Sequence, residues 1–163
     1  MIMRSLFVFI IAVVVLAGVN YEIYHKEQLL TEGTTILLEL APVDPRSLIQ
    51  GDYMVLRYKI ARLQALYEAK KDGYLVIERN EQDIAHFKRI YDENTPLEAG
   101  TLLLRFRKRG SEIRLGAESF FFQEGHAKYY ENARYGEVKV TPSGESVLVG
   151  LRDAELKPLG PSS

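Results

Sequence analysis

Residues 35–58 read TILLELAPVDPRSLIQGDYMVLRY. The run 35–41 is mostly apolar and the run 53–58 alternates in character, so each is predicted to form a β-strand. Two prolines and a Gly-Asp pair separate the two runs. Because proline fixes φ and lacks a backbone N–H, the intervening segment is predicted to form irregular turns between one strand and the next.

Short apolar runs of the same kind recur along the rest of the chain. Further strands are predicted at residues 74–78, 84–91, 101–107, 112–115, 119–122, 137–140 and 146–151. Residues 60–71 carry good helix formers and an apolar stripe, and residues 124–135 are predicted to form a second short helix that ends at Gly136. The pattern predicts a mainly β fold, either a β-sandwich or a partly open barrel with one or two short helices.

The N-terminus is the most apolar part of the chain. No residue from Leu6 to Val19 is charged, and extension from Ser5 to Tyr24 gives the roughly 20 residues that cross a bilayer as a helix. Arg4 precedes this run, so the positive-inside rule predicts a cytoplasmic N-terminus. Residues 5–24 are therefore predicted to hold the chain in the lipid bilayer of the inner (cytoplasmic) membrane, as a single-pass transmembrane helix with a periplasmic body.

These features divide the chain into regions. Residues 1–24 are the membrane anchor or an uncleaved signal sequence, 25–34 a juxtamembrane helix or linker, 35–157 a β-rich extracytoplasmic domain, and 158–163 a flexible tail. Residues 22–33 are predicted to continue the anchor as a helix that ends near Gly33. A cleaved signal peptide is an alternative, because residues 15–17 resemble a small-residue cleavage site. With either a membrane anchor or a cleaved signal peptide, the domain 35–157 is predicted to lie outside the cytoplasm.

Composition excludes several classes of protein. The 163 residues hold 21 Lys and Arg against 22 Asp and Glu, so no overall basic field attracts nucleic acid. The absence of cysteine excludes disulfides, thiolate metal sites and a cysteine nucleophile. The three histidines are widely spaced and form no His-x-x-x-His pair, so no metal site and no cofactor is predicted.

The middle of the chain carries a recognisable series. Gly51-Asp52-Tyr53, Leu56 and Tyr58 resemble the Gly-Asp-Tyr-x-x-Leu-x-Tyr signature of the GDYXXLXY family of membrane-anchored bacterial proteins. The resemblance implies an inner-membrane anchor and an external β-rich domain, and it implies no reaction. The candidate motif residues that follow from it are Asp44, Pro45, Arg46, Gly51, Asp52, Tyr53, Leu56, Tyr58, Gly116, Glu118, Ser119, Phe120, Glu124 and Gly125, none of them with a catalytic role.

The leading hypothesis for function is a non-enzymatic domain that contacts another membrane or envelope protein. The predicted contact surface is the loop 42–51 with Asp52, Tyr53 and Glu124, because loops on a rigid sheet often carry recognition. An envelope hydrolase is the alternative. In that case the fold would bring the carboxylates of Asp52, Glu118 and Glu124 together.

Two further runs have a distinct chemical character. Residues 105–109 alternate basic and aromatic side chains, which predicts either an anionic-lipid-binding module or a solvated strand end with Phe106 packed inward. Residues 120–122 are all phenylalanine, a run too apolar to face water on both sides, and Tyr129, Tyr130 and Tyr135 follow closely. This aromatic group is predicted to form core and core-rim packing, with a partner-binding surface as the alternative.

Overall fold

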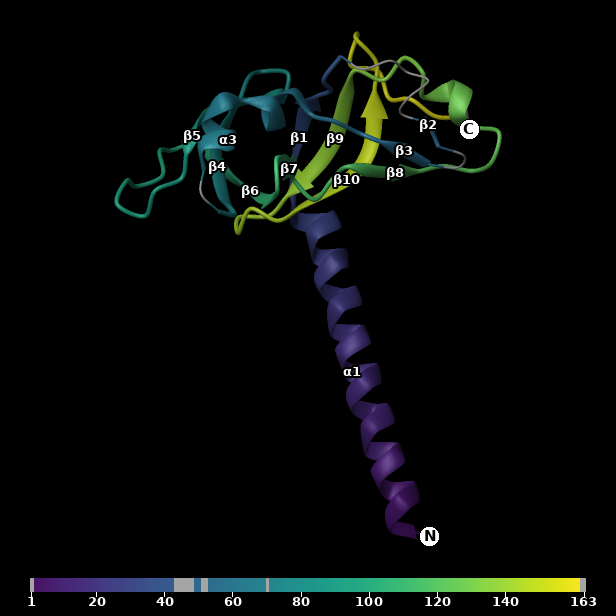
Figure 1. Cartoon of the computed structure of the whole chain (residues 1–163). Helices are drawn as coiled ribbons and strands as arrows, with labels where there is room; N and C mark the ends of the chain where they lie inside the picture. The colour runs from purple at the N-terminus through teal and green to yellow at the C-terminus, as the bar shows by residue number, and fades with distance from the viewer. Residues whose placement is uncertain (1, 43–48, 51–52, 70, 162–163) are drawn as a thin grey trace.

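The computed structural model describes residues 2–42, 49–50, 53–69 and 71–161, and it consists of a long N-terminal helix that carries a β-rich head (Figure 1). The helix α1 (Ile2–Glu32) is continuous and includes the continuation predicted for residues 22–33. It ends directly before Gly33 and strand β1 (Thr34–Glu39), so no loop separates the helix from the head.

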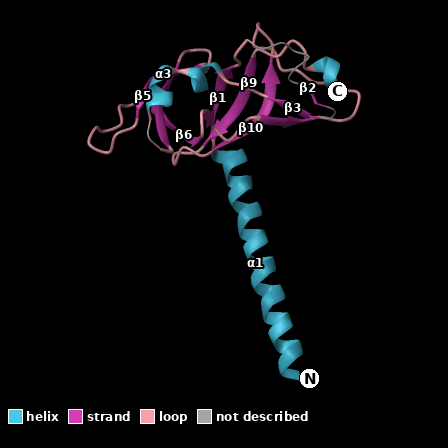
Figure 2. Cartoon of the chain, in the orientation of Figure 1, coloured by secondary structure: helices cyan, strands magenta, loops and turns pink. Residues whose placement is uncertain are grey.

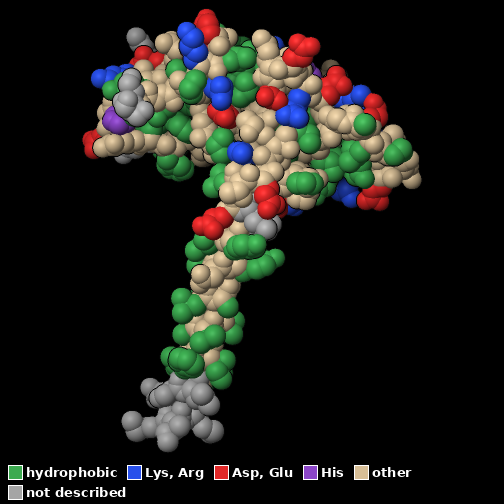
Figure 3. Space-filling model, turned by 180° about the vertical axis from the view of Figure 1, so that it is seen from behind, with side chains coloured by type: hydrophobic (Ala, Val, Ile, Leu, Met, Phe, Trp, Pro, Cys, Tyr) green, Lys and Arg blue, Asp and Glu red, His purple; other side chains and the backbone are tan. Residues whose placement is uncertain are grey.

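An apolar window occupies most of α1. Residues Phe7–Tyr24 form 18 consecutive helical residues that are long and apolar enough to cross a membrane, and the rest of the protein covers none of this window. Figure 3 shows hydrophobic side chains along this part of the helix, whereas the head displays charged side chains of both signs. The apolar surface of α1 is therefore exposed in the isolated chain.

Short strands make up most of the head (Figure 2). After β1 come β2 (Ile49–Gln50), β3 (Tyr53–Val55), β4 (Gly73–Arg79), β5 (Ala85–Ile90), β6 (Thr101–Arg109), β7 (Glu112–Arg114), β8 (Ser119–Phe121), β9 (Tyr135–Val140) and β10 (Ser146–Arg152). Each strand that the sequence predicts is present, with ends that differ by at most three residues. The short helical elements are η1 (Lys59–Arg62), α3 (Gln64–Glu68) and η2 (Ala127–Tyr129).

The strands pair in the orders β1-β9-β10, β2-β3-β8 and β5-β4-β6-β7. Isolated bridges join these sheets, one between Leu37 and Ile84 and another between Leu40 and Tyr58. Together the sheets form a half-barrel around a common interior. This architecture confirms the predicted mainly β fold preceded by an apolar helix.

The interior of the half-barrel is apolar. Met54, Leu56 and Tyr58 occupy alternate positions after the Gly-Asp turn and are each 1% exposed. Phe106 is also 1% exposed, which confirms its inward orientation. The remaining strands contribute Ile36, Leu38, Leu75, Ile77, Leu104, Val138, Val140 and Leu151 to the same core. No polar or charged residue is buried among those whose side chains the structure describes.

The strand register fixes which end of the head lies next to α1. Thr34, the first residue of β1, pairs with Val140, and Val140 pairs with Ser146. The turn 141–145 between β9 and β10 therefore lies at the end of the head where α1 enters. We call this the anchor-side end.

The helix predicted over residues 60–71 is wrong as a single element. Leu63 is extended, with φ −66° and ψ 134°, and it separates η1 from α3. Ile60 and Leu66 are both buried on either side of this break. The apolar stripe that predicts the helix is real, but the chain bends at Leu63 so that both parts of the stripe reach the core.

The helix predicted over residues 124–135 is also wrong. Only the single turn η2 is helical in this segment. Gly125 adopts a φ of +79°, which a right-handed helix excludes. Tyr130 is buried, with its ring 4.9 Å from that of Phe120 and 5.5 Å from that of Phe122. Packing of this ring fixes the irregular path of the segment.

As predicted, the run 120–122 does not face water on both sides, because Phe121 is 73% exposed whereas Phe120 and Phe122 pack against the core. One smaller expectation, for the C-terminal tail, needs correction. The tail predicted to be flexible from residue 158 is partly paired, because Pro158 bridges Arg152 and the Leu159 N–H donates to the Leu151 carbonyl at 2.9 Å.

Candidate functional site

Most of the loop before Tyr53, namely residues 43–48 and 51–52, lies outside the described residues. The sequence-predicted residues in it are Asp44, Pro45, Arg46, Gly51 and Asp52. The site is therefore built from the residues that follow this loop and from the segments they contact.

Tyr58 connects the signature to a second motif segment in the core. Its hydroxyl donates a hydrogen bond to the backbone carbonyl of Ala117. Gly136 leaves the space for this ring, because a Cβ at that position would lie 3.0 Å from both the hydroxyl oxygen and Cε1 of Tyr58. Burial, and secondarily the charge of Glu118, raises the pKa of Tyr58 well above its usual range. The phenol is therefore a neutral donor.

Glu118 closes the turn that presents the Ala117 carbonyl. Its carboxylate accepts hydrogen bonds from the backbone N–H groups of Leu115 and Gly116. Gly116 has a φ of +88°, a conformation that favours glycine. The backbone of Glu118 in turn accepts the Leu56 N–H at 2.7 Å. The segment 116–118 and the signature strand are therefore fastened together by hydrogen bonds at both backbone and side-chain level.

This geometry gives the carboxylate of Glu118 a structural task. Glu118 lines a cavity, but Glu124 is exposed in the turn 123–126 and does not line it. The third carboxylate of the hydrolase hypothesis, Asp52, lies outside the described residues. The structure thus brings no second described carboxylate of that hypothesis beside Glu118 in the cavity.

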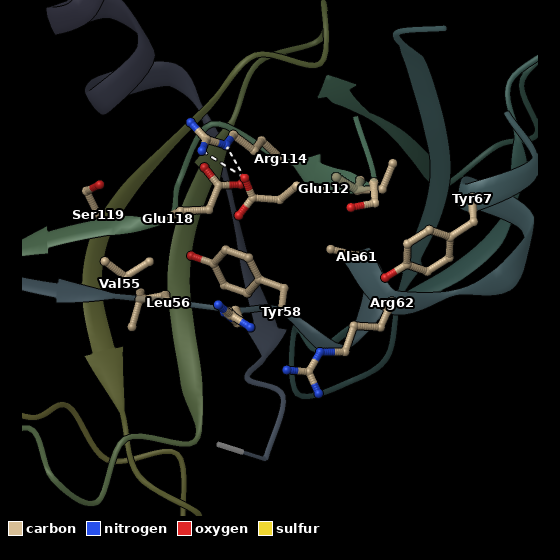
Figure 4. Close-up of a pocket in the computed structure, with 13 residues that line it drawn as sticks. Val55, Leu56, Tyr58, Ala61, Arg62, Tyr67, Glu112, Arg114, Glu118 and Ser119 are labelled. Atoms are coloured by element: carbon tan, nitrogen blue, oxygen red, sulfur yellow. Dashed lines mark hydrogen bonds and ion pairs between the residues drawn. The ribbon is translucent and has the colours of Figure 1, made fainter. Parts of the chain in front are cut away.

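The cavity next to Tyr58 has a volume of about 520 Å³ (Figure 4). Its walls come from the end of β3, η1, α3, β7 and the start of β8, and they include Arg57, Arg62 and Arg114. Arg114 donates to Glu112 at 2.8 and 3.0 Å, and this contact raises the pKa of its guanidinium. Neither Arg57 nor Arg62 has an ion pair within the described part of the chain.

Sequence reasoning missed the basic lining of this cavity. Arg57 lies between Leu56 and Tyr58, so the alternation that sends these two inward places Arg57 on the outside. The position of Arg114 could be predicted from the turn at Gly110, because a hairpin there sets residues 107 and 114 opposite each other. Both signals were present in the sequence, whereas the approach of Arg62 depends on the bend at Leu63.

An aromatic pair, with Phe121 exposed and Tyr53 half-buried, lies on the outer side of β3 and β8. Tyr53 pairs with Phe121 in the strand register, and their ring centroids are 5.7 Å apart. Phe120 points the opposite way and packs with Phe122 and Tyr130. The aromatic segment therefore serves both predicted roles, with core packing on one face and an exposed surface on the other.

The remaining candidate residues do not form a chemical cluster in the described region. Ser119 is exposed on β8, and Gly125 provides the positive φ of the turn 123–126. His126 packs edge-on against Tyr129 at 5.3 Å. No group of three His, Asp or Glu residues that could hold a metal ion occurs among the residues the structure describes.

The fold, with its signature strand hydrogen-bonded to residues 116–118, defines a class of mainly β proteins in which a half-barrel follows an N-terminal apolar helix. The chain belongs to the GDYXXLXY protein family, whose model matches residues 15–151. The match begins inside α1 and ends in β10, so it includes the junction between helix and head. No match to this chain was found among curated proteins or among solved structures.

Proposed function

We propose that this protein is a single-pass inner-membrane protein whose periplasmic head works through contacts with another membrane or envelope protein, without catalysis. The exposed apolar window of α1 supports the anchor, because such a surface is stable only when lipid or protein covers it. In the proposed orientation the N-terminus is cytoplasmic. Arg4 supports this orientation through its position before the window.

The observation that carries the proposed protein contact is the exposure of Phe121. A phenylalanine that is 73% exposed on a strand, with a tyrosine ring beside it, is characteristic of an interface anchor rather than of a solvated edge. Tyr53 belongs to the contact surface predicted from the sequence, which is the loop 42–51 with Asp52, Tyr53 and Glu124. The proposed partner is a membrane protein with a complementary apolar patch.

The anchor supplies the mechanism. Confinement of the head to the membrane surface raises its effective concentration for a partner in the same bilayer, so a modest contact area suffices for association. Phe121, with Tyr53 beside it, would contribute specificity, and the membrane anchor would contribute proximity.

Photo-crosslinking in intact membranes tests this proposal. A photoreactive phenylalanine analogue is placed at Phe121 in the full chain, and a matched control carries it at Leu97, which is 44% exposed in the loop between β5 and β6. We expect a discrete adduct from position 121 that is absent from position 97 and that unlabelled wild-type chain suppresses. Equal and diffuse labelling from both positions would contradict the proposal.

A further inference from the structure

A cluster of arginines lies on the outer face of the β6–β7 hairpin. Arg107 and Arg114 are direct partners in the antiparallel register, so their side chains project from the same face. Arg105 lies two residues before Arg107 and shares that face. Like charges directly opposite each other on a sheet are unfavourable.

The three arginines line a second cavity, of about 200 Å³, together with Glu145 and Ser146. Glu112 is hydrogen-bonded to Arg114, and Glu145 lies 4.0 Å from Arg105. The side chain of Arg107 has no hydrogen bond or ion pair within the described residues. The charge of Glu118 also acts on Arg114, so three carboxylates lie near the three guanidinium groups. Arg107 is the arginine of the cluster that makes no ion pair within the described residues.

The rest of the basic run 105–109 points to other contacts. The Lys108 ammonium donates to the backbone carbonyls of Tyr67 and Ala69 at 2.6 Å each. Arg109 lies 3.6 Å from Asp72. The structure thus selects Arg105 and Arg107 from the run and adds Arg114, which the run does not contain.

Hydrogen bonds place this cavity at the anchor-side end. The Arg105 N–H donates to the Gly144 carbonyl at 2.8 Å, and Gly144 belongs to the turn 141–145. The Ser146 hydroxyl donates to the Leu115 carbonyl at 2.7 Å. In Figure 4, Arg114 lies on the side where α1 enters, whereas Arg62 lies on the opposite side.

The height of the head above the bilayer suits a contact with lipid headgroups. Eight helical residues, 25–32, follow the apolar window, which is a rise of about 12 Å, and Gly33 then leads into β1. The polar layer of a bilayer is roughly 5–8 Å deep on each side. A helix tilt of about 20° lowers one side of the head further. The long arginine side chains then reach the headgroups.

We propose that the cavity of Arg105, Arg107 and Arg114 binds the phosphate headgroup of an anionic phospholipid from the bilayer that holds α1. The placement rests on the proposed membrane anchor, whereas the site itself is independent of any protein partner. Guanidinium groups are well matched to phosphate because their planar forks donate two hydrogen bonds at once. The bound headgroup would relieve the repulsion between Arg107 and Arg114 and fix the orientation of the head on the membrane.

Native mass spectrometry of the full chain in detergent tests the site. The chain is titrated with phosphatidylglycerol or with phosphatidylcholine of the same acyl chains. We expect preferential retention of phosphatidylglycerol, and we expect Arg107→Gln to weaken it about fivefold, the effect of one arginine near an anionic surface. Arg107→Lys should weaken the retention of phosphatidylglycerol less than Arg107→Gln does. Arg62→Gln is the matched control, because it removes another exposed arginine charge, from the other cavity, and should leave retention of phosphatidylglycerol unchanged.

Three outcomes would overturn the proposal. The first is equal retention of the two lipids by the wild-type chain. The second is an equal loss for Arg107→Gln and Arg62→Gln, which would indicate unspecific attraction. The third is displacement of phosphatidylglycerol by equimolar inorganic phosphate, which would assign the site to a free anion. Retention of every variant in alkali-washed membranes reports separately on the anchor, so loss of the anchor and loss of the lipid site are distinguishable.

Discussion

Tyr58 makes a buried hydrogen bond between two distant segments of the head. Its hydroxyl satisfies the Ala117 carbonyl inside the core, and Glu118 holds that carbonyl in place. The tyrosine that ends the family signature is thereby explained by packing and hydrogen bonding. The end of the signature therefore forms a hydrogen-bonded contact between two segments that lie about sixty residues apart in the sequence.

Removal of this hydroxyl should destabilise the protein. We expect Tyr58→Phe to lower the free energy of unfolding by about 1–3 kcal/mol, because the Ala117 carbonyl is then buried without a donor. Thermal unfolding of the full chain in detergent, followed by circular dichroism, measures this loss. Tyr129→Phe is the control, since that ring is 37% exposed. An equal effect of both substitutions would contradict the role of the hydrogen bond.

Tyr58 also makes stability depend on alkaline pH. Burial raises its pKa in the folded state, so the phenol stays protonated where the unfolded chain, with a tyrosine pKa of about 10, loses the proton. Above pH 10 the unfolded state then binds fewer protons, and the free energy of unfolding falls as pH rises, by at most about 1.4 kcal/mol per pH unit. We expect Tyr58→Phe to have a shallower fall. Unfolding midpoints between pH 8 and pH 11 compare the two slopes, and parallel slopes would count against this assignment.

Gly144 offers a second prediction at the residue scale. Its φ is +84°, and an added Cβ would lie 2.9 Å from Cδ1 of Tyr74. Gly110 has a φ of +61° with open space around it. We expect Gly110→Ala to cost about 1–2 kcal/mol from backbone strain alone, and Gly144→Ala to cost about 1–3 kcal/mol more from overpacking. Denaturant unfolding of both variants isolates the steric part, and equal costs would show that the turn moves freely.

Among the elements, β4 is the centre of the head. It lies between β5 and β6, and Leu75, Val76 and Ile77 are all buried. We expect its amides to exchange with solvent most slowly, because they open only with the whole sheet, while the short edge strand β7 exchanges faster. Hydrogen-exchange mass spectrometry of the full chain measures both. Faster exchange in β4 than in β7 would be incompatible with the central position of β4.

The strands could be predicted from the sequence because each carries its own local signal. Alternation identifies β3, and the Gly110 turn identifies the β6–β7 hairpin. The helices were predicted less well, since an apolar stripe does not reveal that one extended residue, Leu63, divides it. The contact of Lys108 with the carbonyls of Tyr67 and Ala69 spans about forty residues, so no local pattern encodes it. The candidate site shares this limit, because its two halves meet through long-range hydrogen bonds, from the Tyr58 hydroxyl to Ala117 and from the Leu56 N–H to Glu118.

At the scale of the whole molecule, α1 makes a direct prediction about location. We expect the full chain to stay in membranes after an alkaline wash, with an intact mass that includes residues 1–24. Val14→Arg combined with Leu16→Arg should release it, because each arginine at the centre of a span costs about 2.5–3.5 kcal/mol. Recovery of a shortened soluble chain from the wild type would indicate a cleaved signal peptide instead.

Because no loop separates α1 from β1, the length of the helix sets both the height of the head and its rotation about the helix axis. Each residue inserted before Gly33 would turn the head by about 100° around the helix axis and raise it by about 1.5 Å. Seven inserted residues would restore the direction to within about 20° while raising the head by about 10 Å. Insertions of increasing length therefore change two quantities in different ways. The direction in which the Tyr53–Phe121 pair faces varies with the helical period, whereas the height of the arginine cavity above the membrane rises steadily. A partner contact would return with the helical period, whereas a headgroup contact would fade steadily with height.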